Sequence, residues 1–316
     1  MSLTKAVRRA AALLALAGVA APGSAGASRP APEPKSDERI GVFLRCTGEE
    51  DPRKALAAVK SLGLHRVQVS RLPDRYYTAE GAREFAGLLA EAGIRSDAVV
   101  VVFGGESYKD QESVLRTVGF RPAALRAPRL DYARRCVDFA AAIGTKVVTF
   151  HMGFLPVKPA DPDYRDMLQA LTDVAVYAAG KGVTVSLETG QETGEALLAF
   201  LESVRGARVG VNFDTANLVL YGLDQPARAL EKLLPRVTSV HVKDGLLPEA
   251  PGRLGREVRL GEGRAQVAQC LRVLERSGFD GPLIIENYVW RDLGTKPLDE
   301  LARARDFIRA SLGRKD

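Results

Sequence analysis

The sequence is poor in the residues that build disulfides and metal clusters. Its 316 residues include three cysteines, three histidines and one tryptophan. Cys46, Cys136 and Cys270 lie far apart in apolar stretches, and none has the CxxC spacing. An odd number of separated cysteines excludes a fold that depends on disulfides and predicts buried free thiols.

Nucleotide-binding motifs and basic runs are also missing. No Gly-x-Gly-x-x-Gly follows the first apolar segment and no Walker A motif occurs, which argues against a nucleotide-binding open sheet. Lysine and arginine are interleaved with acidic residues. Three of the positive residues behind the formal charge of +6 lie in the first 27 residues, where there is no acid, so removal of that segment leaves +3. We therefore expect no nucleic-acid partner.

The first 27 residues predict a signal peptide. The charged start contains Lys5, Arg8 and Arg9, and a short apolar run follows at 10–21. Pro22-Gly23 breaks the run, and the small residues 25–27 precede a cleavage point. The run is too short for a stable membrane anchor; the alternatives are an amphipathic helix and an uncleaved anchor. The Arg8-Arg9 pair allows twin-arginine export, but the alanines after it match that signal poorly, so the Sec route is equally compatible. The sequence predicts an exported, periplasmic or extracellular protein.

Residues 28–38 are rich in proline and charge, which predicts a flexible spacer. The remaining residues, 39–316, have a globular composition. The whole chain is 46% hydrophobic and 27% charged, and its length fits two ordinary domains or one α/β barrel.

After residue 38, short β-branched segments alternate with amphipathic helical ones. We expect strands at 40–45, 66–70, 97–103, 146–151, 183–188, 209–214, 237–242 and 282–287. We expect helices between them, among others at 78–92, 131–143, 165–180, 265–277 and 298–312. Several helices end in glycine just before the next strand, as at Gly93 and Gly144, which is a helix-closing signal. Eight alternating units predict parallel strands and a single-domain, closed (β/α)8 TIM barrel.

Polar side chains occur where the last four strands end. Glu188, Asp214 and Glu286 follow apolar stretches, and His241 lies within the seventh predicted strand. In this architecture the functional residues lie at the carboxyl ends of the strands, and neighbouring strands are about 5 Å apart. Three carboxylates buried side by side require a cation or protons.

Each of these residues has a purely structural alternative. A single glutamate at a strand end can cap a loop, a single histidine can be a core residue, and Asp214 can cap a helix. Four such residues on successive strands favour a site for one divalent metal ion, Mn²⁺, Mg²⁺, Co²⁺ or Zn²⁺.

The strings SLETG, NFDTAN, HVKD, LGEGR and IIEN resemble the sugar phosphate isomerase/epimerase family of the xylose isomerase-like barrel superfamily, over roughly residues 39 to 312. The resemblance implies that Glu188, Asp214, His241 and Glu286 bind one divalent metal. It also implies that Glu188 and Glu286 are the catalytic acid–base pair. The substrate that this resemblance implies is a small sugar or keto-sugar.

The sequence departs from the family at Asn217. Epimerases of the family often have a substrate-binding histidine at this position, three residues after the aspartate, and asparagine cannot become cationic. Ketohexose epimerisation is therefore less well supported. The related barrel endonucleases need further His and Asp ligands for three zinc ions, and a chain with only His65, His151 and His241 supplies too few.

Other residues are candidates for substrate binding. His151 ends the fourth predicted strand on the active face, and Asn217 and Lys243 follow metal ligands. Arg264 follows Gly261 and Gly263 in the chain, and Trp290 follows Glu286. Each of them also has a structural explanation in packing or surface exposure. Asp244 is expected to orient the imidazole of His241. His65, at a strand start, is expected to be structural.

These features predict an isomerase or epimerase that moves a proton next to a sugar carbonyl through an enediolate. The alternatives are a keto-inositol or keto-sugar dehydratase and a barrel that binds sugar without catalysis. Export favours a free sugar, glycoside or keto-derivative over a phosphorylated one. Assembly into a homo-oligomer is compatible with the sequence.

Overall fold

The computed structural model describes residues 36–156 and 160–313. The predicted signal peptide and residues 28–35 of the predicted spacer lie outside this range. The last spacer residues, 36–38, belong to the 3₁₀ turn η1 (Ser36–Arg39), which leads directly into the first strand.

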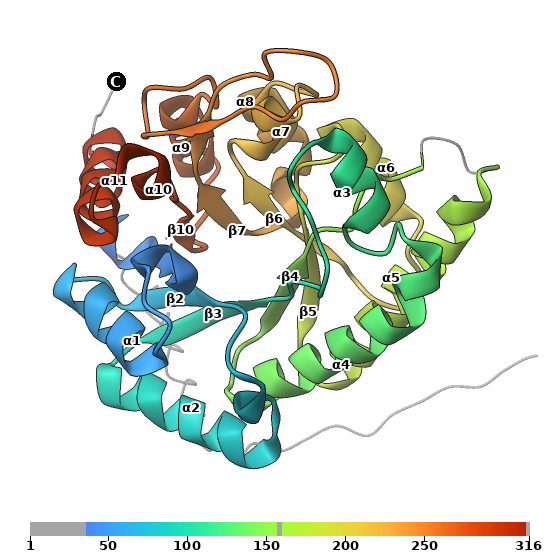
Figure 1. Cartoon of the computed structure of the whole chain (residues 1–316), viewed down its shortest axis with the longest axis horizontal. Helices are drawn as coiled ribbons and strands as arrows, with labels where there is room; N and C mark the ends of the chain where they lie inside the picture. Colours follow the sequence, from blue (N-terminus) through green and yellow to red (C-terminus); the bar gives the residue numbers. More distant parts are fainter. Residues whose placement is uncertain (1–35, 157–159, 314–316) are drawn as a thin grey trace, which may run out of the picture. The chain divides into compact units, whose positions relative to one another are not determined.

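Eight parallel strands close into a barrel in the order β1-β10-β7-β6-β5-β4-β3-β2 (Figure 1). Their bounds are β1 (Ile40–Phe43), β2 (Arg66–Val69), β3 (Arg95–Val100), β4 (Val147–Phe150), β5 (Thr184–Glu188), β6 (Gly210–Asp214), β7 (Val237–Val242) and β10 (Leu283–Ile285). A two-stranded antiparallel hairpin, β8 (Asp244–Gly245) with β9 (Glu257–Val258), follows β7. The predicted single TIM barrel is confirmed.

Helices surround the strands (Figure 1). Their bounds are α1 (Pro52–Ser61), α2 (Ala79–Ala92), α3 (Gln111–Thr117), α4 (Arg126–Ala142), α5 (Pro162–Gly180), α6 (Gly194–Glu202), α7 (Asn217–Leu220), α8 (Pro226–Leu233), α9 (Val267–Arg276), α10 (Trp290–Leu293) and α11 (Pro297–Leu312). Short 3₁₀ turns lie at η2 (Leu44–Thr47), η3 (Asp74–Tyr77), η4 (Ala123–Leu125) and η5 (Leu234–Arg236). Within the described residues, no helix combines the length and the apolarity needed to cross a membrane.

The predicted element boundaries hold to within a few residues, with physical reasons for the shifts. Helix α4 begins five residues earlier than predicted, because Pro128 lies in its first turn, where a missing N–H costs no hydrogen bond. Helix α9 begins later, because Gln266 has a left-handed backbone with φ of 53°. Gly93 closes α2 with φ of 66°, as its sequence position predicts.

The strands bury apolar residues toward the helices, and one continuous hydrophobic cluster joins the two layers. The three cysteines are buried and free, as predicted. Inside the barrel a polar layer interrupts the apolar packing. The side-chain nitrogen of Gln68 donates to Asn212 Oδ1 at 3.4 Å and to Ser239 Oγ at 3.2 Å, and Ser239 also bonds to Asn212. These bonds satisfy polar groups that would otherwise be buried without partners, and they underlie the site described next.

Candidate metal centre and active site

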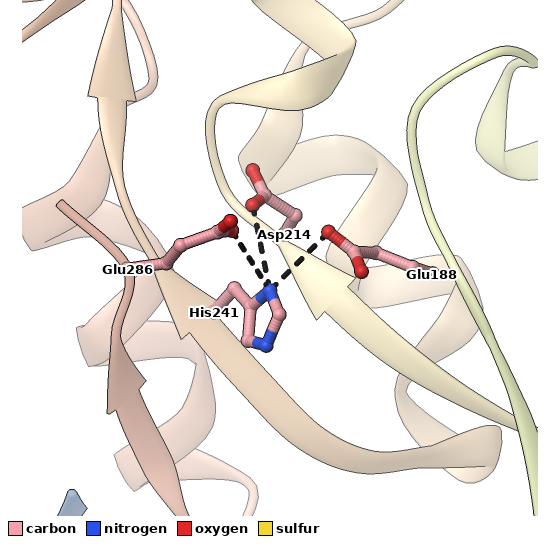
Figure 2. A group of neighbouring side chains, drawn as sticks. All are labelled: Glu188, Asp214, His241 and Glu286. Carbon is pink, nitrogen blue, oxygen red and sulfur yellow. Dashed lines mark hydrogen bonds and ion pairs between the residues drawn. The ribbon is translucent and has the colours of Figure 1, made fainter. Parts of the chain in front are cut away.

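Four side chains converge at the carboxyl ends of neighbouring strands (Figure 2). Glu188 is the last residue of β5 and Asp214 the last of β6, while Glu286 directly follows β10. His241 lies in β7, where the strand register pairs it with Asp214 on one side and Ile284 on the other. The structure thus brings together the four residues predicted to bind metal.

The imidazole of His241 is the centre of the group. Its Nδ1 lies 3.2 Å from Glu188 Oε1, 3.0 Å from Glu286 Oε2 and 3.8 Å from Asp214 Oδ2 (Figure 2). One potential ligand atom from each residue lies within 4.8 Å of all the others. Three carboxylate oxygens and one imidazole nitrogen at this spacing form the donor set expected for one divalent cation.

The two oxygens of Asp214 have different partners. Oδ1 accepts the backbone N–H groups of Ala216 and Asn217, both at 2.8 Å, and so caps the turn that opens α7. Oδ2 faces the group, as does Glu286 Oε2, and the donors nearest to these two oxygens are the side chains of His241 and Lys243. The helix-capping alternative for Asp214 is therefore realised by one oxygen, while the other is left for a cation. These buried carboxylate oxygens, which face one point and have only cationic side chains beside them, fit a metal ligand set.

The second nitrogen of His241 is oriented by Gln68. Nε2 lies 2.7 Å from Gln68 Oε1, which can only accept, so Nε2 carries a proton. Nδ1 faces the carboxylates and would ligate a cation after releasing its own proton. The orienting role was expected of Asp244, and that expectation is wrong. The Asp244 carboxylate instead accepts backbone N–H groups of four residues, Gly245, Gly261, Gly263 and Ala265.

The sequence does contain a signal for Gln68. Its amide lies between two valines, Val67 and Val69, of a predicted barrel strand, and an amide buried there needs a polar partner. Its partner His241 lies 173 residues away, so local pattern does not identify the pair.

Lys243 places a cation between two of the carboxylates. Its Nζ lies 3.1 Å from Asp214 Oδ2 and 2.8 Å from Glu286 Oε2. Burial favours the neutral carboxyl group and raises the pKa of Asp214 to about 6, although Lys243 opposes that change. Burial acts in the same sense on Glu286, but the cations of Lys243 and His241 outweigh it and hold its pKa well below the usual range.

The other carboxylate is also kept ionised. Burial tends to raise the pKa of Glu188, yet His151 and His241 lower it below its ordinary value. Burial alone would lower the pKa of His241, but Glu188 and Glu286 raise it to about 10. The concentration of negative charge therefore draws protons and cations to this point, as a metal site requires.

Three of the five residues predicted to bind substrate lie beside the four candidate metal ligands. His151 Nε2 lies 3.4 Å from Glu188 Oε1, and the Asn217 amide donates to the same oxygen at 3.2 Å. Lys243 is the third. Arg264 is exposed and contributes a backbone N–H to Gly245, and Trp290 begins α10, half-buried. The structure does not bring Arg264 or Trp290 to the cavity wall.

A cavity of about 560 Å³ opens beside the metal ligands. Its size suits a small molecule. Aromatic rings of Phe43, Tyr108, Tyr221 and Tyr288 line it, together with Glu188, His241 and Glu286 and the substrate candidates His151, Asn217 and Lys243.

Nothing in the sequence marked Gln191 and Tyr221, two residues beside this cavity, as functional. Gln191 bridges His151 and Tyr221, with its amide nitrogen 3.3 Å from His151 Nδ1 and donating to the Tyr221 hydroxyl at 3.1 Å. Both lie in irregular connections after β5 and β6, where no periodic pattern predicts side-chain direction.

Comparisons with known proteins agree with this geometry. Residues 56–311 match the family of xylose isomerase-like TIM barrels. L-ribulose-5-phosphate 3-epimerase UlaE of Salmonella typhi is 25% identical over 275 residues, which make up 82% of this chain and 89% of that protein.

Solved structures are similar as well. A xylose isomerase domain protein from Planctomyces limnophilus is 35% identical, with a TM-score of 0.75 over 81% of this chain and 90% of that one. A xylose isomerase-like TIM barrel protein from Mycobacterium smegmatis, solved in complex with magnesium, shares the fold at 22% identity and a TM-score of 0.62, over 82% and 87% of the two chains. The chain belongs to the xylose isomerase-like TIM barrel family.

Proposed function

We propose that this protein is a metal-dependent sugar isomerase or epimerase that transfers a proton at the carbon next to a carbonyl group. The observation that carries the proposal is the convergence of Glu188 and Glu286, from β5 and β10, on one point shared with Asp214 and His241. The sugar epimerases among its relatives support an enzyme of the isomerase class.

A divalent cation bound by Glu188, Asp214, His241 and Glu286 would supply a Lewis acid for the negative charge that develops on the substrate oxygens. Asp214 and His241 would complete the ligand set, and Gln68 keeps Nδ1 of His241 directed at the centre. Glu188 and Glu286, both kept ionised by neighbouring cations, are available as bases.

In the proposed reaction one of these glutamates removes the proton beside the carbonyl, which leaves an enediolate. Return of the proton to the opposite face of the same carbon gives an epimer, and return to the neighbouring carbon gives an isomer. Lys243, with its ammonium group beside both Asp214 and Glu286, is placed to hydrogen-bond a substrate oxygen. Because the two glutamates share one centre, they titrate as a set.

Deuterium incorporation tests the proposal. Metal-loaded protein in D₂O, incubated with a panel of 2-ketoses, is expected to exchange the proton beside the carbonyl of at least one of them. Glu188→Gln and Glu286→Gln are expected to lower exchange by a factor of about 100 or more. Glu249→Gln, at an exposed position outside the cavity, is the matched control.

Sugars that bind without any exchange would remove the isomerase proposal and favour a binding protein. A product that has lost water would instead favour the dehydratase. Undiminished exchange in either glutamine variant would remove that glutamate from the mechanism.

We also propose that the protein is exported, on the basis of the signal-like residues 1–27. Expression of the full chain and of a chain without these residues, followed by cell fractionation, tests this. Retention of the full chain in the cytoplasm at its full length would contradict it.

A further inference from the structure

The cavity wall carries cations that the proposed chemistry does not use. Arg45, Arg71, Lys109, Arg253 and Arg291 all line the cavity, and its acidic lining residues are the metal ligands Glu188 and Glu286. The five cations come from different loops, after β1, β2, β3, within the β8–β9 hairpin and in α10. They therefore gather at this mouth through the fold and not through any run in the sequence.

These five cations have no ion-pair partner among the described residues. Arg45, Arg71, Lys109 and Arg253 make no side-chain hydrogen bond there either. Arg291 lies over two aromatic rings, 4.4 Å from the Tyr288 centroid and 5.1 Å from that of Trp290. Several arginines elsewhere in the molecule do pair with carboxylates, as in the Arg259–Glu300 bridge at 2.7 Å. Like charges that line one cavity repel each other unless an anion enters.

Arg71 shows a second, independent sign of a binding role. Among residues 36–156 and 160–313, it is one of two non-glycine residues with positive φ, at 48°. A side chain in this conformation costs about 1 kcal/mol or more, and such strain concentrates at ligand sites. Glycine at this position would have no such strain. The presence of arginine instead indicates that its guanidinium group has a function.

The neighbouring residue, Ser70, is a third sign of a binding role. Its hydroxyl is buried, with 2% of the residue exposed, and Oγ has no hydrogen-bond partner. Ser70 lines the cavity together with Arg45 and Arg71. Glu49 and Glu50 border a small adjoining hollow with both arginines but form no ion pair with them. A buried hydroxyl donor and two guanidinium groups that line one cavity are a set that suits an oxyanion.

We propose that Arg45, Ser70 and Arg71 bind an anionic group of the substrate, so that the substrate is an acidic sugar bearing a carboxylate or a phosphate. Strand β2 lies opposite β6 in the ring of eight. The anionic group therefore lies across the mouth from Asp214, at the far end of the sugar from its reacting carbonyl. This inference rests on the proposed function for the identity of the ligand as a sugar, and it adds an anionic group to the sugar expected from export.

Binding measurements on the metal-loaded protein test the inference. The probes are D-fructose, D-fructuronate, D-fructose 6-phosphate and inorganic phosphate, measured by calorimetry. We expect at least one of the two acidic ketoses to bind about ten times more tightly than fructose, a preference that weakens with added salt. The relative affinities of the carboxylate and the phosphate identify which anion the site takes.

The variants separate this site from the metal. Arg71→Gly removes the guanidinium group and the backbone strain together, so it is expected to fold at least as stably while the preference for the acidic ketoses disappears. Arg71→Lys is expected to keep part of that preference. Arg83→Gln, at an exposed arginine of α2, is the matched control and should change affinity less than twofold. Phosphate bound to the metal would survive Arg71→Gly, whereas phosphate bound by Arg71 would not.

Equal affinity for fructose and both acidic ketoses, unchanged anion affinity in Arg71→Gly, or no binding of any anion would overturn the inference. Deuterium exchange in the same samples separates it from the proposed function. Exchange that is equally fast for fructose and the acidic ketoses overturns the acidic substrate alone. Anion-selective binding with no exchange in any ketose overturns the isomerase and leaves the anion site in place.

Discussion

At the scale of single residues, Gln68 controls the metal centre without touching the metal. Its Oε1 accepts from His241 Nε2 and so directs Nδ1 toward the carboxylates. We expect Gln68→Leu to weaken metal affinity by a factor of about 10 to 100, because the ring loses its fixed tautomer and orientation. Metal titration followed by calorimetry measures this, and Gln68→Glu, which keeps an acceptor, should recover part of the affinity. Wild-type affinity in Gln68→Leu would show that Gln68 is only a packing residue.

Glu192 gives the protein a pH dependence that is separate from the metal ligands. Burial without a cationic partner raises its pKa from 4.5 to about 8, and its Oε1 accepts no hydrogen bond. The folded protein therefore holds this proton more tightly than the unfolded chain. The resulting stabilisation is complete below about pH 4.5 and is lost as the pH rises toward 8.

Glu192→Gln removes that dependence. As the pH rises from 5 to 8, the wild type loses the stabilisation from the Glu192 proton and the variant does not. We therefore expect the free energy of unfolding of the variant, relative to that of the wild type, to increase by a few kcal/mol over this range. Urea unfolding of both proteins at the two pH values measures the change, with Glu231→Gln at an exposed position as the control. The same difference between variant and wild type at both pH values would contradict the buried, uncompensated carboxylate.

At the scale of elements, Asp244 organises the segment that follows the β8–β9 hairpin. Its carboxylate accepts N–H groups of Gly261, Gly263 and Ala265 at 2.9 to 3.1 Å, besides that of Gly245. The approach is close, since a Cβ atom on Gly263 would lie 2.1 Å from Asp244 Oδ1. The LGEGR string is thus a folded loop held by one acid, and its exposed Arg264 does not line the cavity.

Asp244→Ala is expected to destabilise the fold by about 3 kcal/mol or more, because several buried N–H groups lose a charged acceptor. Limited proteolysis should then cut between residues 259 and 265, and Tm should fall. Asp292→Ala, at an exposed position in α10, serves as the control. A loop that stays protease-resistant with an unchanged Tm would show that other contacts hold it.

At the scale of the whole molecule, the metal site links strands that are distant in sequence. Its ligands come from β5, β6 and β7 and from the residue after β10, so a bound cation joins half of the barrel ring. Adding Mn²⁺ at about 100 times its Kd is expected to raise Tm by on the order of 5 °C, since the folded state alone has the complete ligand set.

Thermal unfolding with and without metal measures this shift, and His241→Ala should abolish it. Metal analysis of the purified protein should give close to one ion per chain. Three ions per chain would instead support the endonuclease alternative, and an unchanged Tm in saturating metal would contradict the site.

The sequence alone determined the barrel and the four converging residues. Alternating β-branched strands and amphipathic helices have strong periodic patterns, and parallel strands necessarily present their carboxyl ends at one face. Glu188, Asp214, His241 and Glu286 could therefore be assigned to one mouth from their strand-end positions. The burial of the free cysteines, the glycine that closes α2 and the parallel arrangement of the strands were predicted from the same local patterns.

Tertiary structure decided the contacts that cross the barrel and the directions of loop side chains. Gln68 meets His241 only after the ring closes, and Asp244 turns to a loop instead of the adjacent imidazole because several N–H groups there need an acceptor. Arg45 and Arg71 reach one cavity because their loops follow neighbouring strands β1 and β2. Irregular loops have no period, so the positions of their side chains depend on closure of the whole barrel.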